Sequence, residues 1–498
     1  MQLFTQDASY YAEQIKEGKV TCVELVKQAL KNIEGLNPKL NAVISTQEEY
    51  ALKQAEHYDR EMKNKEVLPP FYGVPTLLKD LGQQQEGFPA TSGSKLLKDY
   101  IAEQTDYFVE KVIRAGFIIV GRTNVPEFGF KGISDAKQTG RVNAPYDLSR
   151  NPGGSSGGAA AALKAGIVPL AFASDGGGSI RLPASYSGLI GLKPSRGRVI
   201  VGPGGYRGWQ GCSVNFALTR SVHDTWTLLK ELQTQQLEAP FNIPMIEETS
   251  LAELDRPLTI AYSYDSPIGA EVSEISKQNI TRTVELLKQL GHKLIEAKPH
   301  TDDFKLLKTY YEMNSVETAA VFQEMEEHLG RKLTPDDMEP MTWLIFKAGE
   351  KIPAADFSRI LAFWDQYTVQ REAFISQYDL AITPITDGPA PIHGQFEYGK
   401  YEEDMLAAES LSREEQQALI WKDFEKGQDY MAYAFCQNIA GQPAISLPLF
   451  ETEEGLPLGT HFWAGKGQEY ILLQLAKQLE DAGHLKTDLK LSAELSAQ

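Results

Sequence analysis

Two glycine-framed serines are the residues of this chain whose type and spacing best suit acyl-transfer chemistry. Ser155 lies in GGSSGG and Ser179 in DGGGSIR, 24 positions apart. Between them the sequence predicts a helix of about 9 residues, roughly 14 Å long, and a strand that rises roughly 18 Å. Since the chain goes out along the helix and returns along the strand, both serines can finish at one sheet edge, where α/β enzymes place their sites.

The residues directly before Ser179 are Gly176, Gly177 and Gly178. Glycines turn tightly and can present consecutive backbone N–H groups to one point without side-chain obstruction. Such an oxyanion hole is worth about 3 to 4 kcal/mol per essential donor in acyl transfer. We therefore predict Ser179 as nucleophile and the N–H groups of residues 176–179 as oxyanion donors. A simple polar turn is the alternative, but the apolar run from Ile180 onward argues against a linker.

A serine hydroxyl needs a base to become a nucleophile. The eight histidines are scattered, whereas Lys79 ends the apolar run GVPTLLK. For this lysine to accept a proton near neutrality, its pKa must fall from about 10.4 to about 7 or 8, which burial behind Leu77 and Leu78 could supply. The competing interpretation is a surface ion pair between Lys79 and its neighbour Asp80.

The order GVPTLLKDL, GGSSGG, SDGGGSIRLPASYSGLIGLKP resembles the amidase-signature family of Ser-cisSer-Lys amide hydrolases. Further matching segments are ALKNIEGLNPKLNAVI, GRTNVPEFGF, NIAGQPAISLP and GLPLGTHFWAG, so the resemblance covers nearly the whole chain. The segment DGGGSIRLPAS followed by LKPSRGR is most similar to the branch that contains hydrolases of cyclic 6-aminohexanoate dimers.

The resemblance implies one α/β domain over residues 1–498, built on a central mixed sheet with helices on both faces. It implies Ser179 as the acylated nucleophile, Ser155 as a bridging serine after a cis peptide bond, and Lys79 as the base. Ser156, Asp175 and Arg181 would hold the loop from behind. No metal or organic cofactor is implied, and EDTA is expected to have no effect.

This chain departs from the family pattern at two positions. The family often has threonine where this chain has Ser174, and often a bulky residue where it has Gly176. Neither difference removes a catalytic group.

Other functions explain less of the sequence. An α/β-hydrolase would use Ser155 in a G-x-S-x-G elbow, but no strand precedes it and Lys79 stays unexplained. The glutaminase subunit of a tRNA-dependent amidotransferase shares the scaffold, and a non-catalytic binding protein on this fold is a further alternative. A phosphate-binding loop is disfavoured because no Lys-Ser/Thr pair follows a glycine run.

The amino-acid composition indicates which partners and which cellular compartment to expect. The net charge of −18 disfavours nucleic acid, and three sparse cysteines in 498 residues suit reduced thiols in a cytoplasm. The first residues lack a basic stretch followed by an apolar core, so no secretory signal is expected, and no apolar run reaches the roughly 20 residues of a membrane span. We expect a cytoplasmic monomer or homodimer that acts on a small-molecule amide. Segments 128–134, 310–322 and 384–393 are expected to form the walls of its pocket.

Helices followed by strands recur along the chain, and these elements must position the candidate catalytic residues. A capping box at Thr21 opens a helix that Gly35 and Pro38 should end. Helix–strand pairs follow at residues 108–121, 159–173 and 273–297, which predicts an α/β sheet. The catalytic core is expected at about 70–225, with peripheral excursions at about 231–257 and 395–418.

Overall fold

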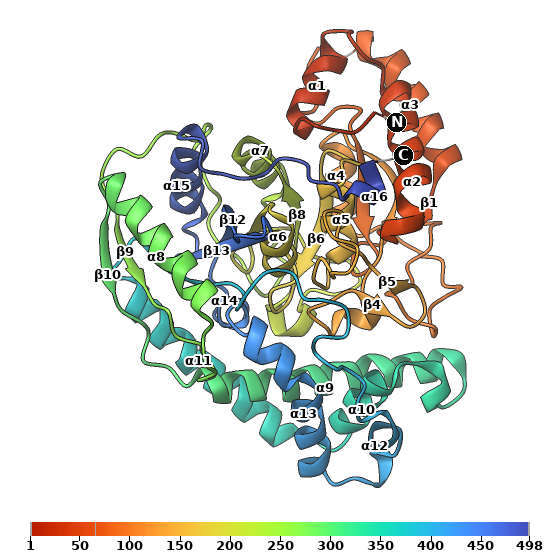
Figure 1. Ribbon diagram of the computed structural model, residues 1–498. Coiled ribbons are helices and arrows are strands. Elements are labelled where there is room, and N and C mark those ends of the chain that lie inside the picture. Colours follow the sequence, from red (N-terminus) through yellow and green to blue (C-terminus); the bar gives the residue numbers. More distant parts are fainter. Residues whose placement is uncertain (1, 65, 497–498) are drawn as a thin grey trace.

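The computed structural model describes residues 2–64 and 66–496. Its centre is an 11-stranded sheet flanked by helices on both faces (Figure 1). The strand order is β1-β3-β2-β6-β8-β7-β12-β13-β11-β9-β10. The strands are β1 (Val43–Thr46), β2 (Pro75–Lys79), β3 (Ile118–Thr123), β6 (Ala171–Asp175), β7 (Ile190–Lys193), β8 (Val214–Thr219), β9 (Thr259–Tyr262), β10 (Lys293–Glu296), β11 (Leu380–Pro384), β12 (Ala444–Glu451) and β13 (Pro457–Trp463).

The sheet is mixed. Strands β3, β2 and β6 are parallel, as are β11, β9 and β10, whereas the strands from β6 through β8, β7, β12 and β13 to β11 pair antiparallel. A short separate pair is formed by β4 (Asp135–Ala136) and β5 (Gly140–Arg141). The predicted α/β class with a central mixed sheet is therefore confirmed.

The helices fall into a group around the sheet and a group below it (Figure 1). Those around the sheet are α1 (Ala8–Lys16), α2 (Cys22–Leu40), α3 (Glu48–Glu61), α4 (Tyr107–Arg114), α5 (Gly157–Lys164), α6 (Arg181–Ser187), α7 (Val222–Leu232), α8 (Glu274–Gln289) and α15 (Glu469–Asp481). Those below it are α9 (Asp303–Leu329), α10 (Pro340–Gly349), α11 (Ala354–Ile375), α12 (Glu402–Leu406), α13 (Arg413–Met431) and α14 (Phe435–Ala440), which share a second apolar core.

The capping box at Thr21 is present, but the prediction that Gly35 and Pro38 end this helix is wrong. Helix α2 continues to Leu40, and Asn41 takes the left-handed conformation that closes it. Asparagine tolerates that conformation better than most residues, so the helix ends where a suitable cap is available.

Helix α5 is buried on every side, which the sequence GGAAAALK permits. A Cβ atom at Gly158 would lie 2.4 Å from the backbone nitrogen of Asn124. Only glycine fits there, so this helix can press against the sheet next to Ser155.

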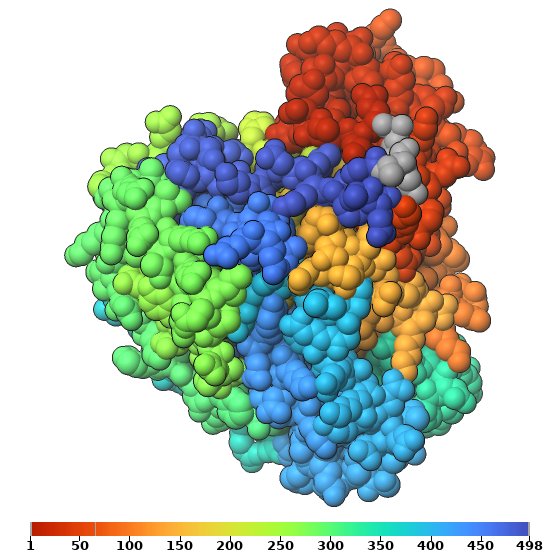
Figure 2. Space-filling model, viewed as in Figure 1, coloured from red at the N-terminus to blue at the C-terminus, as the bar shows by residue number. Residues whose placement is uncertain are grey.

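The C-terminal segment crosses the surface from α15 back to the N-terminal helices, ending with α16 (Ala493–Ser496) (Figures 1 and 2). Lys39 Nζ donates to the carbonyl of Glu494 at 2.7 Å, and the Ser492 N–H donates to the carbonyl of Pro145 at 2.8 Å. None of the helices in the described part of the chain is long and apolar enough to cross a membrane.

Candidate active site

Lys79 ends strand β2 and is fully buried. Its Nζ donates to Ser155 Oγ at 2.8 Å, Ser174 Oγ at 2.9 Å and the Ser174 carbonyl at 3.3 Å. Burial lowers the pKa of Lys79 to about 7, although the negative charge of Asp175 acts in the opposite direction. A lysine with this pKa is partly neutral at physiological pH and can accept a proton.

Asp80 does not pair with Lys79, so the surface ion-pair interpretation is wrong. The Asp80 carboxylate accepts hydrogen bonds from Thr91 N at 2.9 Å, Thr91 Oγ1 at 2.5 Å and Gly93 N at 3.2 Å. Lys79 and Asp80, which directly follows strand β2, are both buried, and each has its own hydrogen-bond partners.

Ser155 lies in the loop before α5 and follows a cis peptide bond from Gly154. Its side chain is buried beside Lys79. No strand leads into this loop, which residues 151–153 enter without regular structure. The strand-to-helix turn that an α/β-hydrolase elbow requires is therefore missing here. Ser156 Oγ contacts both the N–H and the carbonyl of Ser174, at 3.4 and 3.3 Å.

Ser179 lies in the loop between β6 and α6 and is half-buried. It lines two cavities, and Ser155 and Ser174 line the larger of them with it. The prediction that the helix and strand bring both serines to one sheet edge is confirmed in that both face this cavity. The strand itself is shifted toward the site, since β6 ends at Asp175 and not at Ala173.

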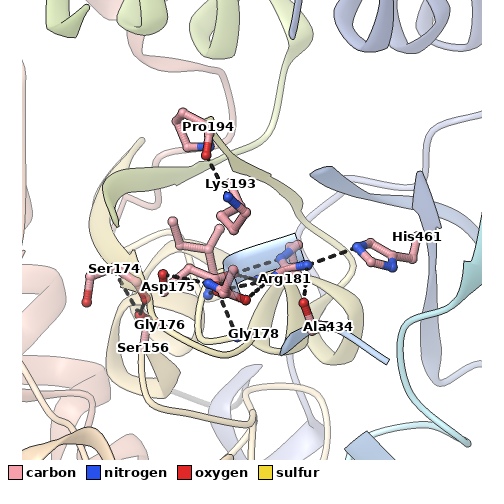
Figure 3. Close-up of polar contacts among 12 residues, drawn as sticks. Ser156, Ser174, Asp175, Gly176, Gly178, Arg181, Lys193, Pro194, Ala434 and His461 are labelled. Carbon is pink, nitrogen blue, oxygen red and sulfur yellow. Dashed lines mark hydrogen bonds and ion pairs between the residues drawn. The ribbon is translucent and has the colours of Figure 1, made fainter. Parts of the chain in front are cut away.

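The Asp175 carboxylate shapes this loop from behind (Figure 3). It accepts from Gly178 N at 2.7 Å, Ile180 N at 3.2 Å and Asn438 Nδ2 at 2.8 Å. The Arg181 guanidinium meets it with Nε at 2.9 Å and Nη2 at 3.0 Å. Burial raises the pKa of Asp175, but the charge and hydrogen bonds of Arg181, together with Asn438 and Lys193, hold this pKa well below its usual range.

The prediction that the Gly178 N–H group is an oxyanion donor is wrong. Because its N–H donates to Asp175, it is already satisfied and does not face a substrate. Its φ of 136° requires glycine, and this backbone turn points the N–H inward. Among the described residues, no acceptor takes the N–H groups of Gly176, Gly177 and Ser179.

Two residues far along the chain complete the support of Arg181. His461 Nε2 accepts from Arg181 Nη1 at 3.0 Å (Figure 3). Asn438 Oδ1 accepts from Arg181 Nη2 at 2.6 Å. Burial and the neighbouring Arg181 hold the pKa of His461 well below its usual range. The scattered histidines thus include one that supports the site. Its signal in the sequence is its place in GLPLGTHFWAG.

Lys193 is a second fully buried lysine behind the loop, and its Nζ donates to the Pro194 carbonyl at 2.7 Å (Figure 3). Burial and the nearby Arg181 lower its pKa to about 7.

The larger cavity has a volume of about 450 Å³ and the smaller about 70 Å³. The predicted wall segments 128–134 and 310–322 line both cavities: Phe130 lines both, Tyr310 the smaller and Phe322 the larger. The third predicted wall, 384–393, is described throughout and lines neither. It lies beside α13 instead, where Tyr430 Oη donates to the Pro389 carbonyl.

Comparison with known proteins identifies the family to which this chain belongs. The family model described as Amidase matches residues 24–473. A lipoamidase of Enterococcus faecalis is 37% identical over 94% of this chain, although the chain spans only 62% of that relative's length. The 6-aminohexanoate-cyclic-dimer hydrolase of Paenarthrobacter ureafaciens is 31% identical, with 96% of this chain and 94% of the relative covered.

A solved structure of 6-aminohexanoate cyclic dimer hydrolase complexed with substrate superposes with a TM-score of 0.87. The two chains are 30% identical, and 98% of this chain and 99% of the other are covered. The resemblance that the three motifs predict is thereby confirmed, and the chain belongs to the amidase family of amide-hydrolysing enzymes.

Proposed function

We propose that this protein hydrolyses the amide bond of a small molecule through an acyl-serine intermediate. The observation that carries the proposal is the 2.8 Å contact between Lys79 Nζ and Ser155 Oγ, on a cavity that Ser179 also lines. A buried lysine linked to one serine, which shares a cavity with a second serine, is the arrangement that proton relay to a nucleophile requires.

In the first half-reaction, neutral Lys79 takes the proton of Ser179 through the Ser155 hydroxyl. Ser179 Oγ forms a bond to the carbonyl carbon, and the carbonyl oxygen becomes an oxyanion. When the carbon–nitrogen bond breaks, the same relay returns the proton to the leaving nitrogen. The products of this step are the acyl-enzyme and a neutral amine or ammonia.

In the second half-reaction, a water molecule replaces the amine. Lys79 takes a water proton through Ser155, hydroxide adds to the acyl carbon, and the ester bond to Ser179 Oγ breaks. The serine recovers its proton and the acid leaves. Throughout, the oxyanion is held by the N–H groups of Gly176, Gly177 and Ser179, since that of Gly178 is engaged by Asp175.

The relatives suggest the substrate class. One is named a lipoamidase and another a hydrolase of a cyclic amide dimer. Aromatic and aliphatic side chains line both cavities, which suits an apolar acyl part. We propose a linear or cyclic small-molecule amide as substrate, without a nucleic acid partner.

A fluorophosphonate tests the nucleophile, with intact-protein mass spectrometry as the readout. The wild type should gain one label, Ser179→Ala none, and Ser155→Ala and Lys79→Ala should label much more slowly. A label that persists in Ser179→Ala and maps to Ser155 would overturn the assignment.

We also propose a cytoplasmic location and a monomer or homodimer. All three cysteines are buried and unpaired, as is usual where thiols stay reduced. Activity recovered in the extracellular fraction of the native host would contradict the proposed location, and light scattering would give the mass of the assembly.

A further inference from the structure

The two cavities that meet at Ser179 differ in their access to the proton relay. Ser155 and Ser174 line the larger cavity but not the smaller. In the proposed function, on which this inference rests, Ser155 delivers the proton to the leaving nitrogen. A proton donor must lie within hydrogen-bond reach of the atom it protonates, so the leaving amine occupies the larger cavity and the acyl part the smaller.

The larger cavity carries charge of one sign. Of the described residues that line it, Asp106 and Glu317 are charged, and no lysine or arginine side chain lines it. Asp106 accepts from Gln84 N at 2.8 Å, and buried Arg122 nearby offsets part of its charge. Glu317 is half-buried and accepts one hydrogen bond, from Gln210 Nε2 at 2.6 Å. Its charge therefore dominates the cavity.

The smaller pocket offers no comparable free charge. Its lysine, Lys131, contacts Asp135 at 2.6 Å and Glu339 at 3.2 Å, so the cation is already paired. The two cavities therefore differ in charge, and this difference can distinguish the acyl part of a substrate from its leaving amine.

Trp209, the neighbour of Gln210, forms an aromatic wall of the larger cavity together with Phe130. Trp209 and Gln210 both have positive φ, 50° and 53°, which is an uncommon conformation for residues with side chains. The Trp209 ring lies parallel to the Phe130 ring, with 6.2 Å between their centroids. Aromatic faces attract cations in addition to packing against alkyl chains.

We propose that this site selects amides whose leaving amine carries a second, positively charged amino group on an alkyl chain. The chain lies against the aromatic wall of the larger cavity, and the Glu317 carboxylate binds the ammonium group. A leaving amine that carries a carboxylate is disfavoured, because two carboxylates already line the cavity.

Three amides that share one acetyl group, small enough for the smaller cavity, and have amines of one length test this proposal. Their amine parts are 1,5-diaminopentane (acylated on one nitrogen), pentylamine and 5-aminopentanoate. The chain of the leaving amine therefore ends in a cationic, a neutral or an anionic group, respectively. We expect kcat/KM to be about tenfold higher for the cationic than for the neutral amide, and lowest for the anionic one. Raising the ionic strength should narrow the difference.

Glu317→Gln removes the charge and keeps an oxygen that can accept from Gln210. We expect it to reduce the preference for the cationic over the neutral amide, measured as the ratio of their kcat/KM values, to about threefold or less. Glu285→Gln, on the exposed face of α8, makes the same change in net charge and should leave the preference unaltered.

Equal rates for the three amides, or an unchanged preference in Glu317→Gln, would overturn the inference. If Ser179 takes the fluorophosphonate label but none of the three amides is hydrolysed, the assignment of the larger cavity to such amines is wrong. If Ser179 takes no label, the proposed function itself fails.

Discussion

Trp209 lies over Gly176 so closely that a Cβ atom at that glycine would be 2.7 Å from Trp209 Cε3. The space beside Gly176 is filled by an indole ring that comes from residues 208–211, more than 30 positions further along the chain. The indole ring therefore lies directly beside one of the proposed oxyanion donors.

This contact makes Gly176→Ala disruptive. The added methyl must displace the indole or the loop, and overpacking of this kind costs about 1 to 3 kcal/mol. We expect kcat/KM to fall about tenfold. In a Trp209→Ala background the same substitution should cost much less, and a double-mutant cycle measures the coupling. Equal losses in both backgrounds would show that the contact does not matter.

The pH dependence follows from the burial of Lys79. With a pKa lowered to about 7, the lysine is protonated below that pH and neutral above it. Since the neutral form is the proposed base, kcat/KM should rise with pH, pass its midpoint near 7 and reach a plateau. A falling or flat profile between about pH 6 and 8 would contradict the role of Lys79.

Lys193 provides the matched control for that profile, because burial lowers its pKa to about 7 as well. Its Nζ bonds to the Pro194 carbonyl and not to either serine. Lys193→Met should therefore retain the rising limb with its midpoint near 7. If the limb disappears in this variant, the titration belongs to Lys193.

Much of the site could be predicted from the sequence because its chemistry is local. The glycine-framed loops and the lysine at the end of an apolar run are contiguous patterns, and short helix–strand connections bring them to one cavity. The antiparallel half of the sheet was expected only from the resemblance, since its pairing joins distant segments such as β7 and β12.

Contacts made by distant residues were not predictable in the same way. His461 and Asn438 meet Arg181 only after the chain has folded across the sheet. The Gly178 N–H was expected to face the substrate because glycine can turn either way. The Asp175 carboxylate, three residues earlier, decides the direction.

The buried pair of Asp175 and Arg181 should matter for stability as well as catalysis. Asp175→Asn leaves the Arg181 guanidinium buried without its counter-charge, which typically costs about 3 to 5 kcal/mol. We expect a lower free energy of unfolding in denaturant titrations, together with a loss of fluorophosphonate labelling. The double variant with Arg181→Met should be less unstable than the sum of the single changes, because no isolated charge remains.

Substitutions of Ser174 test how its contact with Lys79 affects the pKa of that lysine. Its hydroxyl accepts from Lys79 Nζ at 2.9 Å, and such a contact favours the charged lysine. Ser174→Ala removes this acceptor and leaves the Ser155 contact in place. We therefore expect the midpoint of the pH profile to move below its wild-type value, while kcat at the plateau falls through poorer positioning of the amine. Ser174→Thr keeps a hydroxyl at this position and should restore the wild-type midpoint. A purely structural role for Ser174 predicts a different pattern, in which the rate falls and the midpoint stays where it is.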